Sequence, residues 1–118
     1  MSTKTLGNDG EELACEYLEN KGYEILARNF TTKLGEVDIV ALDEDEVVLV
    51  EVKTKKTAFF ADPWVNVNRT KMGKVWRAGQ VYLLQSGLSD RPVRIDVVSV
   101  ILGSGKAEIE HFEDVFED

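Results

Sequence analysis

Residues 35–53 read GEVDIVALDEDEVVLVEVK, and this stretch decides the fold that the sequence predicts. Apolar residues dominate 37–42 and 47–52, and the acidic residues 43–46 separate the two runs. Two short apolar runs on either side of a polar turn predict an antiparallel hairpin. Because both faces of each run are apolar, we expect both strands to be central and buried.

The polar residues within these runs predict a reactive site. If the hairpin closes symmetrically about its acidic turn, Asp38 faces Glu51 and Glu36 faces Lys53 on one face of the sheet. Two facing carboxylates repel each other unless a divalent cation lies between them. Carboxylates, a hard metal and a lysine are a set suited to phosphodiester hydrolysis. Two alternatives stay open: Lys53 pairs with Glu36 while the other carboxylates lie at a solvated strand end, or an odd-length turn shifts the register.

The remaining pattern predicts an α/β fold in one domain spanning residues 1–118. Apolar spacing and turn residues predict two helices, at about 8–20 and from 68 to before 87. The inward stripe of the second helix is expected to be Met72, Val75, Trp76, Gly79, Tyr82 and Leu83. Strands are expected at 23–29, 36–42, 47–53, 93–102 and 107–112. This order predicts a mixed sheet with helices packed on it.

Composition limits the type of metal site and the cellular compartment. With one cysteine, Cys15, and one histidine, His111, a structural zinc site is excluded, because such sites need about four Cys or His ligands. Any metal would be a hard, oxygen-bound ion such as Mg²⁺ or Mn²⁺. The apolar runs are too short to span a bilayer, and no signal-peptide run is present, so we expect a cytoplasmic protein without membrane contact.

The charge is unevenly distributed. The chain carries −8 overall, while residues 53–77 hold seven basic side chains and one acidic side chain, which makes that window +6 and the remainder −14. The segment from about 108 to 118 is an acidic tail. Six residues of the basic window beyond Lys53 are candidates for phosphate contact: Lys55, Lys56, Arg69, Lys71, Lys74 and Arg77. The alternative is a solvated surface without a ligand.

The same residues carry a resemblance to known nucleases. Asp38, followed thirteen residues later by Glu51-Val52-Lys53, resembles the PD-(D/E)xK signature, with Val37 in the place of proline. More closely, the chain resembles the YraN-like family of small bacterial proteins, to which endonuclease activity is usually ascribed. The matching segments are Gly7–Glu11, Ala14, Tyr17-Leu18, Gly22-Tyr23, Arg28-Asn29, Gly35–Ala41, Val50–Lys55 and Arg94–Val98.

This resemblance implies a restriction-endonuclease-like fold, with a central mixed sheet of about five strands flanked by two main helices, related to Holliday-junction resolvases. It implies an Mg²⁺- or Mn²⁺-dependent endonuclease that cuts branched or otherwise unusual DNA in repair or recombination. Asp38, Glu51 and Glu11 would hold the metal, and Lys53 would act on the attacking water or the developing charge. Glu36 would be either a ligand or a partner of Lys53. The resolvase analogy also suggests a homodimer.

Two other functions remain open. The second hypothesis is an inactive nucleic-acid-binding or protein-interaction module on a nuclease fold, in line with the acidic net charge of the chain. The third is a metal-dependent phosphatase. Phe59, Phe60 and Trp64, in the stretch after the catalytic strand, are expected to pack against the domain or a second subunit rather than stack on bases. Asp96 is expected to form a structural salt bridge, and His111 is assigned no function.

Overall fold

The computed structural model describes residues 3–56, 69–103 and 105–116, with the backbone alone for residues 3–8. Within these residues, the elements follow in the order that the sequence predicted. They are α1 (Thr3–Asn20), β1 (Glu24–Thr32), β2 (Gly35–Asp43), β3 (Glu46–Lys55), α2 (Arg69–Ser86), β4 (Val93–Ile101) and β5 (Glu108–Phe112).

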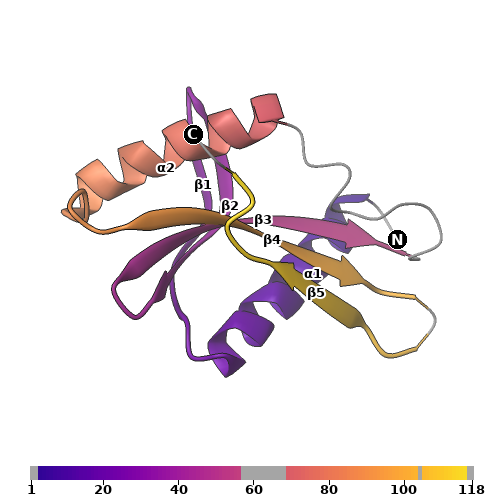
Figure 1. The fold of residues 1–118 in the computed structure, drawn as a ribbon. Coiled ribbons are helices and arrows are strands. Elements are labelled where there is room, and N and C mark those ends of the chain that lie inside the picture. The colour runs from indigo at the N-terminus through magenta and orange to yellow at the C-terminus, as the bar shows by residue number, and fades with distance from the viewer. Residues whose placement is uncertain (1–2, 57–68, 104, 117–118) are drawn as a thin grey trace.

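The strands form one mixed sheet in the order β1-β2-β3-β4-β5. Neighbouring strands are antiparallel except β3 and β4, which run parallel and follow each other in the chain with α2 between them. Figure 1 shows α2 above the sheet and α1 below it. The predicted α/β fold, with a five-stranded mixed sheet and two flanking helices, is confirmed.

Most boundaries lie within two residues of the prediction, and two differ by more. The first helix begins at Thr3 rather than near Asn8, so that Asn8 and Asp9, the expected start, lie inside the helix. The first strand continues beyond Asn29 to Thr32. This extension matters for the site, because it carries β1 past the position of Asp38 on the neighbouring strand.

Each face of the sheet has its own apolar core. On one face, α1 contributes Ala14, Cys15 and Leu18, which pack with Ile39, Ala41, Val48, Val50, Val98 and Val100. On the other face, α2 contributes Met72, Val75, Ala78 and Leu83, which pack with Val37, Val40, Val47, Leu49 and Ile95. Fully burying one such side chain stabilises the fold by about 1.5–3 kcal/mol. Of the stripe expected on α2, Trp76 and Tyr82 are half-buried and pack at its margin against Phe116 and Phe30.

Two glycines allow the helices to lie close to β3. A Cβ atom on Gly79 of α2 would lie 2.2 Å from Cδ1 of Leu49, so only glycine fits beneath this turn of the helix. A Cβ atom on Gly10 of α1 would lie 1.9 Å from Oγ1 of Thr54. The second contact brings the start of α1, and with it Glu11, to the end of β3 that follows Glu51.

The end of the chain returns to the sheet. After β5, the N–H of Val115 donates a hydrogen bond of 2.8 Å to the carbonyl oxygen of Ile95 on β4. In the described part of the chain, no helix has the length and apolar character needed to cross a membrane.

Candidate active site

Strands β2 and β3 part at Asp38. Their pairing follows the predicted register from Leu42–Val47 to Ile39–Val50 and extends no further. The Asp38 side chain then takes the place of a strand partner, because its Oδ2 accepts a hydrogen bond of 2.8 Å from the N–H of Val52. The hairpin prediction is therefore confirmed up to this point. Beyond it, neither of the expected facing pairs, Asp38–Glu51 and Glu36–Lys53, belongs to the β2–β3 ladder.

The residues expected to face each other at the open end have other neighbours in the sheet. Glu36 pairs with Thr31 on β1, and Lys53 pairs with Ser99 on β4. Beyond Ile39, β2 remains paired with β1 and β3 remains paired with β4, while β2 and β3 no longer pair with each other. A gap of this kind lets groups from both faces of the sheet approach the same carboxylates.

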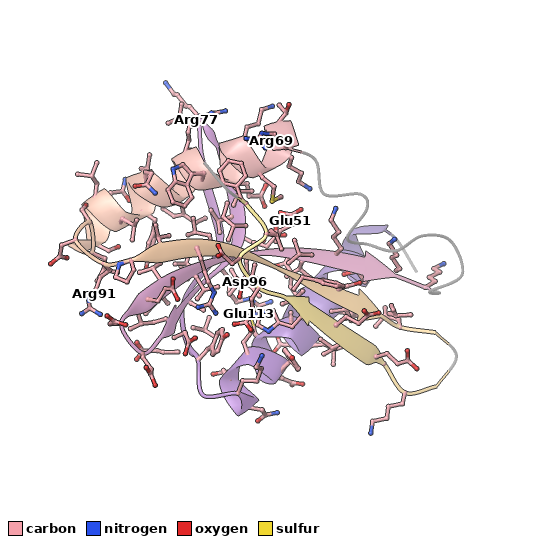
Figure 2. The ribbon with its side chains drawn as sticks, viewed as in Figure 1. Glu51, Arg69, Arg77, Arg91, Asp96 and Glu113 are labelled. Atoms are coloured by element: carbon pink, nitrogen blue, oxygen red, sulfur yellow. The ribbon has the colours of Figure 1, made fainter. Side chains whose placement is uncertain are left out.

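Glu51 lies on the α2 side of this opening. Its side chain is 5% exposed, and it forms an ion pair with Lys71 in the first turn of α2, whose side chain is 56% exposed. Burial lowers the pKa of Lys71, but the hydrogen bond and charge of Glu51 outweigh that effect and raise it. Figure 2 shows Glu51 between the sheet and the Arg69 end of α2. Lys71 thus neutralises the most buried carboxylate of the site.

The negative charge of Asp38 is less well neutralised than that of Glu51. Burial, followed by the negative charge of Glu51, raises the pKa of Asp38 from 3.8 to about 7. The hydrogen bond from Val52 opposes this shift only in part, and the charges of Glu11 and Glu36 add to it. The two carboxylates predicted to act together are therefore electrostatically coupled, although they are not direct partners in the sheet.

Glu11, on α1, lies near the carboxylates of Asp38 and Glu51. Burial raises the pKa of Glu11, a hydrogen bond with the Asn29 side chain lowers it in part, and the charges of Glu36 and Glu51 raise it further. One of its carboxylate oxygens, Oε1, is buried and has no hydrogen-bond partner. A buried carboxylate oxygen without a partner is costly, and a cation would remove that cost.

Lys53 and Glu36 lie at the margin of this cluster. Lys53 is half-buried on β3, two residues beyond Glu51, and so its side chain leaves the same face of the strand. Glu36 is exposed, and its charge raises the pKa values of Asp38 and Glu11. Neither role considered for Glu36, metal ligand or partner of Lys53, is tested by these contacts.

The donor set suits a hard divalent cation. Among the residues that the structure describes, no three His, Cys, Asp or Glu side chains lie close enough together to form a metal site. The Glu51 carboxylate is paired with the Lys71 ammonium. Two observations nevertheless fit a cation: the unpartnered Oε1 of Glu11 and the repulsion between Asp38 and Glu51. All available donors are carboxylate oxygens, which Mg²⁺ and Mn²⁺ prefer.

The candidate phosphate-binding residues fall into two groups. Arg69, Lys71, Lys74 and Arg77 are exposed on α2, and Figure 2 shows Arg69 and Arg77 on the side of this helix away from the sheet. Lys55 is half-buried at the end of β3, and Lys56 follows it on the surface. Phe59, Phe60 and Trp64 lie outside the described residues.

Comparison with known proteins identifies the family. The model described as "Uncharacterised protein family UPF0102" matches residues 10–100. The chain belongs to this family. The sequence resemblance to the YraN-like group is thereby confirmed at the level of the family.

Full-length UPF0102 relatives align along nearly the whole chain. The UPF0102 protein of Alkaliphilus oremlandii is 44% identical over 115 residues, which cover 96% of this chain and 98% of the relative. The UPF0102 protein of Syntrophomonas wolfei is 41% identical, with 96% and 98% covered. The UPF0102 protein of Geobacter metallireducens is 38% identical, with 99% and 96% covered.

Asn29, within the segment that the UPF0102 model matches, lies near Glu11 and was not among the predicted site residues. Asn29 lies within β1 with φ of 53°, a left-handed conformation that is rare inside a strand, and its side chain lowers the pKa of Glu11 in part. Asparagine is depleted in strands and tolerates this conformation, so an asparagine within an otherwise extended segment was the available signal. It suggested the end of a strand instead.

A second polar cluster of this UPF0102 protein surrounds Asp96 on β4. Asp96 is fully buried and pairs with Arg94, as expected, at 3.0 Å, and also with His111 at 2.7 Å. His111 therefore has a structural partner that its position in an acidic segment did not suggest. Nδ1 of His111 lies 2.9 Å from Nζ of Lys21. Because an ammonium group only donates, Nδ1 accepts this bond and Nε2–H donates to Asp96.

Proposed function

We propose that this protein is a metal-dependent endonuclease that hydrolyses DNA phosphodiesters. The observation that carries the proposal is the approach of the half-buried Asp38 carboxylate to the buried Glu51 carboxylate, whose charge helps raise the pKa of Asp38, at the opening between β2 and β3 and two residues from Lys53. Such strained carboxylates are unfavourable for the fold alone and are typical of functional sites. On the resolvase analogy, the substrate is branched or otherwise unusual DNA in repair or recombination.

Each residue of the site has a role in this proposal. Asp38, Glu51 and Glu11 hold Mg²⁺ or Mn²⁺, which when bound polarises the phosphate and lowers the pKa of a water molecule. The Val52 N–H fixes the orientation of the Asp38 carboxylate through its 2.8 Å hydrogen bond. The Lys53 ammonium orients the attacking water or stabilises the negative charge that develops on the phosphate oxygens.

The exposed basic residues of α2 supply DNA contacts in an otherwise acidic protein. Arg69 and Lys71 lie in the first turn of α2, where the helix dipole disfavours positive charge. The same end of a helix favours a bound anion, so a phosphate group placed there would interact with the helix dipole and with these side chains. The DNA backbone would then run along α2 above Glu51, with Lys71 exchanging its carboxylate partner for a phosphate.

One alternative function has specific support. The net charge of −8 opposes binding of long DNA, and the ion pair between Glu51 and Lys71 neutralises a proposed metal ligand. Both features suit an inactive binding or interaction module on a nuclease fold. A homodimer and a cytoplasmic location belong to the nuclease proposal as expectations, since a dimer would allow both strands of a junction to be cut.

A cleavage panel tests the proposal. Wild type, Lys53→Ala and the surface control Lys106→Ala are incubated with labelled four-way junctions, flaps, single strands and plain duplex in Mg²⁺ or Mn²⁺. We expect metal-dependent cutting by wild type and Lys106→Ala, strongest on branched DNA. Lys53→Ala should be slower by about 100- to 1,000-fold, the usual effect of losing one group that stabilises transition-state charge.

The same panel separates the alternatives. If no substrate is cut under any metal while DNA is bound with a steep salt dependence that survives Lys53→Ala, the binding module is favoured. Hydrolysis of a phosphate monoester without cutting of DNA would favour the phosphatase.

A further inference from the structure

Ser99 of β4 is a buried polar residue without a partner. Its side chain is 0% exposed, and its Oγ forms no hydrogen bond in the described part of the chain. The other buried polar or charged side chains of the described residues are paired, Glu51 with Lys71 and Asp96 with Arg94. A buried hydroxyl group without a partner lowers the stability of a fold. Ser99 is therefore a candidate for a role in function rather than in folding.

The register of β3 and β4 places Ser99 beside the lysine of the proposed site. Ser99 pairs with Lys53, and the preceding pair on the same face is Val97 with Glu51. This face is the α2 side of the sheet, because Leu49, two residues before Glu51, packs in the apolar cluster of that helix. Neighbouring strands lie about 4.8 Å apart, so the hydroxyl of Ser99 is within reach of the long, flexible Lys53 side chain.

The Lys53 ammonium group is suited to a neutral acceptor. It has three N–H donors, and within the described residues it forms no ion pair. Glu51, two residues away on the same face, pairs with Lys71 instead. A carboxylate partner would neutralise the charge that Lys53 directs at a phosphate group. A hydroxyl oxygen can accept a hydrogen bond and orient the ammonium without neutralising it.

We propose that Ser99 is a positioning residue for Lys53: its buried hydroxyl oxygen accepts a hydrogen bond from the Lys53 ammonium when DNA occupies the site. This inference rests on the proposed function, which gives Lys53 its role beside the phosphate. In the free protein the Ser99 hydroxyl is unpaired, so the hydrogen bond is gained only with the substrate. An interaction gained in this way acts on the rate of the reaction rather than on the stability of the free protein.

A purely structural role for Ser99 makes a different prediction. If the hydroxyl group stabilised the fold, Ser99→Ala would lower the unfolding midpoint. The substitution removes only the Oγ atom, and this atom has no partner in the described part of the chain. We therefore expect the midpoint of Ser99→Ala to be unchanged or raised, because a buried unpaired polar group is lost.

The test is single-turnover cleavage, in Mn²⁺, of the labelled DNA that wild type cuts fastest. Wild type, Ser99→Ala and Ser89→Ala, a control at an exposed serine, are compared over a range of enzyme concentrations. We expect Ser99→Ala to lower the maximal rate constant about 10-fold, the usual effect of losing one hydrogen bond to a charged group. The enzyme concentration that gives half the maximal rate should stay unchanged, and Ser89→Ala should cut like wild type.

A double-mutant cycle shows whether Ser99 acts through Lys53. In the Lys53→Ala background, Ser99→Ala should have no further effect on the rate, because the ammonium group that it positions is absent. Equal slowing by Ser99→Ala in both backgrounds would overturn the proposed route through Lys53.

The outcomes distinguish the inference from the function on which it rests. A wild-type rate in Ser99→Ala, with Lys53→Ala still slow, would overturn the positioning role and leave the nuclease proposal intact. A lowered unfolding midpoint in Ser99→Ala would also overturn it, because the hydroxyl would then stabilise the free protein. If wild type cuts no DNA, the proposed function fails and this inference fails with it.

Discussion

Asp38 and Asp96 lie on β2 and β4, on either side of β3, and the fold treats these two carboxylates in opposite ways. Asp96 accepts hydrogen bonds from Nε of Arg94 at 3.0 Å and from the N–H of Asp114 at 3.0 Å, and it pairs with His111. Burial alone would raise its pKa, but these partners outweigh burial and lower it. Asp38 has one N–H donor and a neighbouring carboxylate, and its pKa is raised to about 7.

The difference separates a structural carboxylate from a functional one. Asp96 has the partners that a buried charge needs, and it ties β4 to β5 and to the end of the chain. Asp38 lacks them, so its charged form opposes folding until another positive group is present. Asp38 and Asp96 have the same side chain, and the one whose charge lacks partners, Asp38, belongs to the proposed site.

The largest expected effect on stability is at Asp96. Asp96→Asn removes the buried acceptor shared by Arg94, His111 and the N–H of Asp114, while Glu46 and Glu113 still pair with Arg94, and it should lower the free energy of unfolding by about 2–4 kcal/mol. Denaturant unfolding at pH 7 in EDTA measures this change, and Asp90→Asn, at an exposed loop position, is the matched control. A loss below about 1 kcal/mol, comparable with that of a surface substitution, would contradict the structural role of Asp96.

Asp38→Asn should raise the free energy of unfolding of the metal-free protein, whereas Asp96→Asn should lower it. Because the folded-state pKa of Asp38 is raised from 3.8 to about 7, the folded protein binds more protons than the unfolded chain between these pH values. Wild type in EDTA should therefore lose stability as pH rises from about 4 to 7. At pH 8, Asp38→Asn should be more stable than wild type by about 1–4 kcal/mol, and at pH 4 the difference should vanish.

Unfolding curves at pH 4 and pH 8, in EDTA, check this prediction for wild type and Asp38→Asn together. If Asp38→Asn destabilises the metal-free protein at pH 8 as Asp96→Asn does, the two carboxylates are alike and the comparison fails.

The smallest expected effect is at Lys71, whose ammonium competes with a metal ion for Glu51. Lys71→Met should tighten Mn²⁺ binding by about threefold to tenfold, since a pair with one exposed partner is worth about 1 kcal/mol. It should also weaken DNA binding and reduce the salt dependence by about one released counterion. Lys74→Met, one turn along α2, should weaken DNA binding but leave Mn²⁺ affinity unchanged. Equal Mn²⁺ affinities in the two variants would contradict competition at Glu51.

The fold was predictable because its local signals agree. The acidic turn at 43–46 fixes the hairpin register, and the apolar residues of 37–42 and 47–52 place both strands centrally. Met72, Val75 and Leu83 repeat at helical spacing and are buried as expected. Strand alternation and helical period are local properties, so one sequence is sufficient to read them.

The site was predictable only in part, because its geometry depends on contacts far apart in the chain. The sequence predicts Asp38 and Glu51 as site residues. The hydrogen bond from the Val52 N–H to Asp38 forms where β2 and β3 separate, and a regular hairpin register does not predict that separation. The ion pair between Lys71 and Glu51 depends on how α2 crosses the sheet. Asn29 was missed because its left-handed backbone is a property of the folded strand pair, and the sequence shows only a poor strand former.

The most direct measurement is single-turnover cleavage of a labelled four-way junction in Mn²⁺ by wild type, Asp38→Asn and Asp90→Asn. The proposed site predicts that Asp38→Asn cuts about 1,000-fold more slowly, because metal polarisation is worth several kcal/mol of barrier, while Asp90→Asn cuts like wild type. Cleavage that persists at the wild-type rate in a folded Asp38→Asn protein would contradict the assignment of Asp38 and its neighbours as the metal-dependent nuclease site.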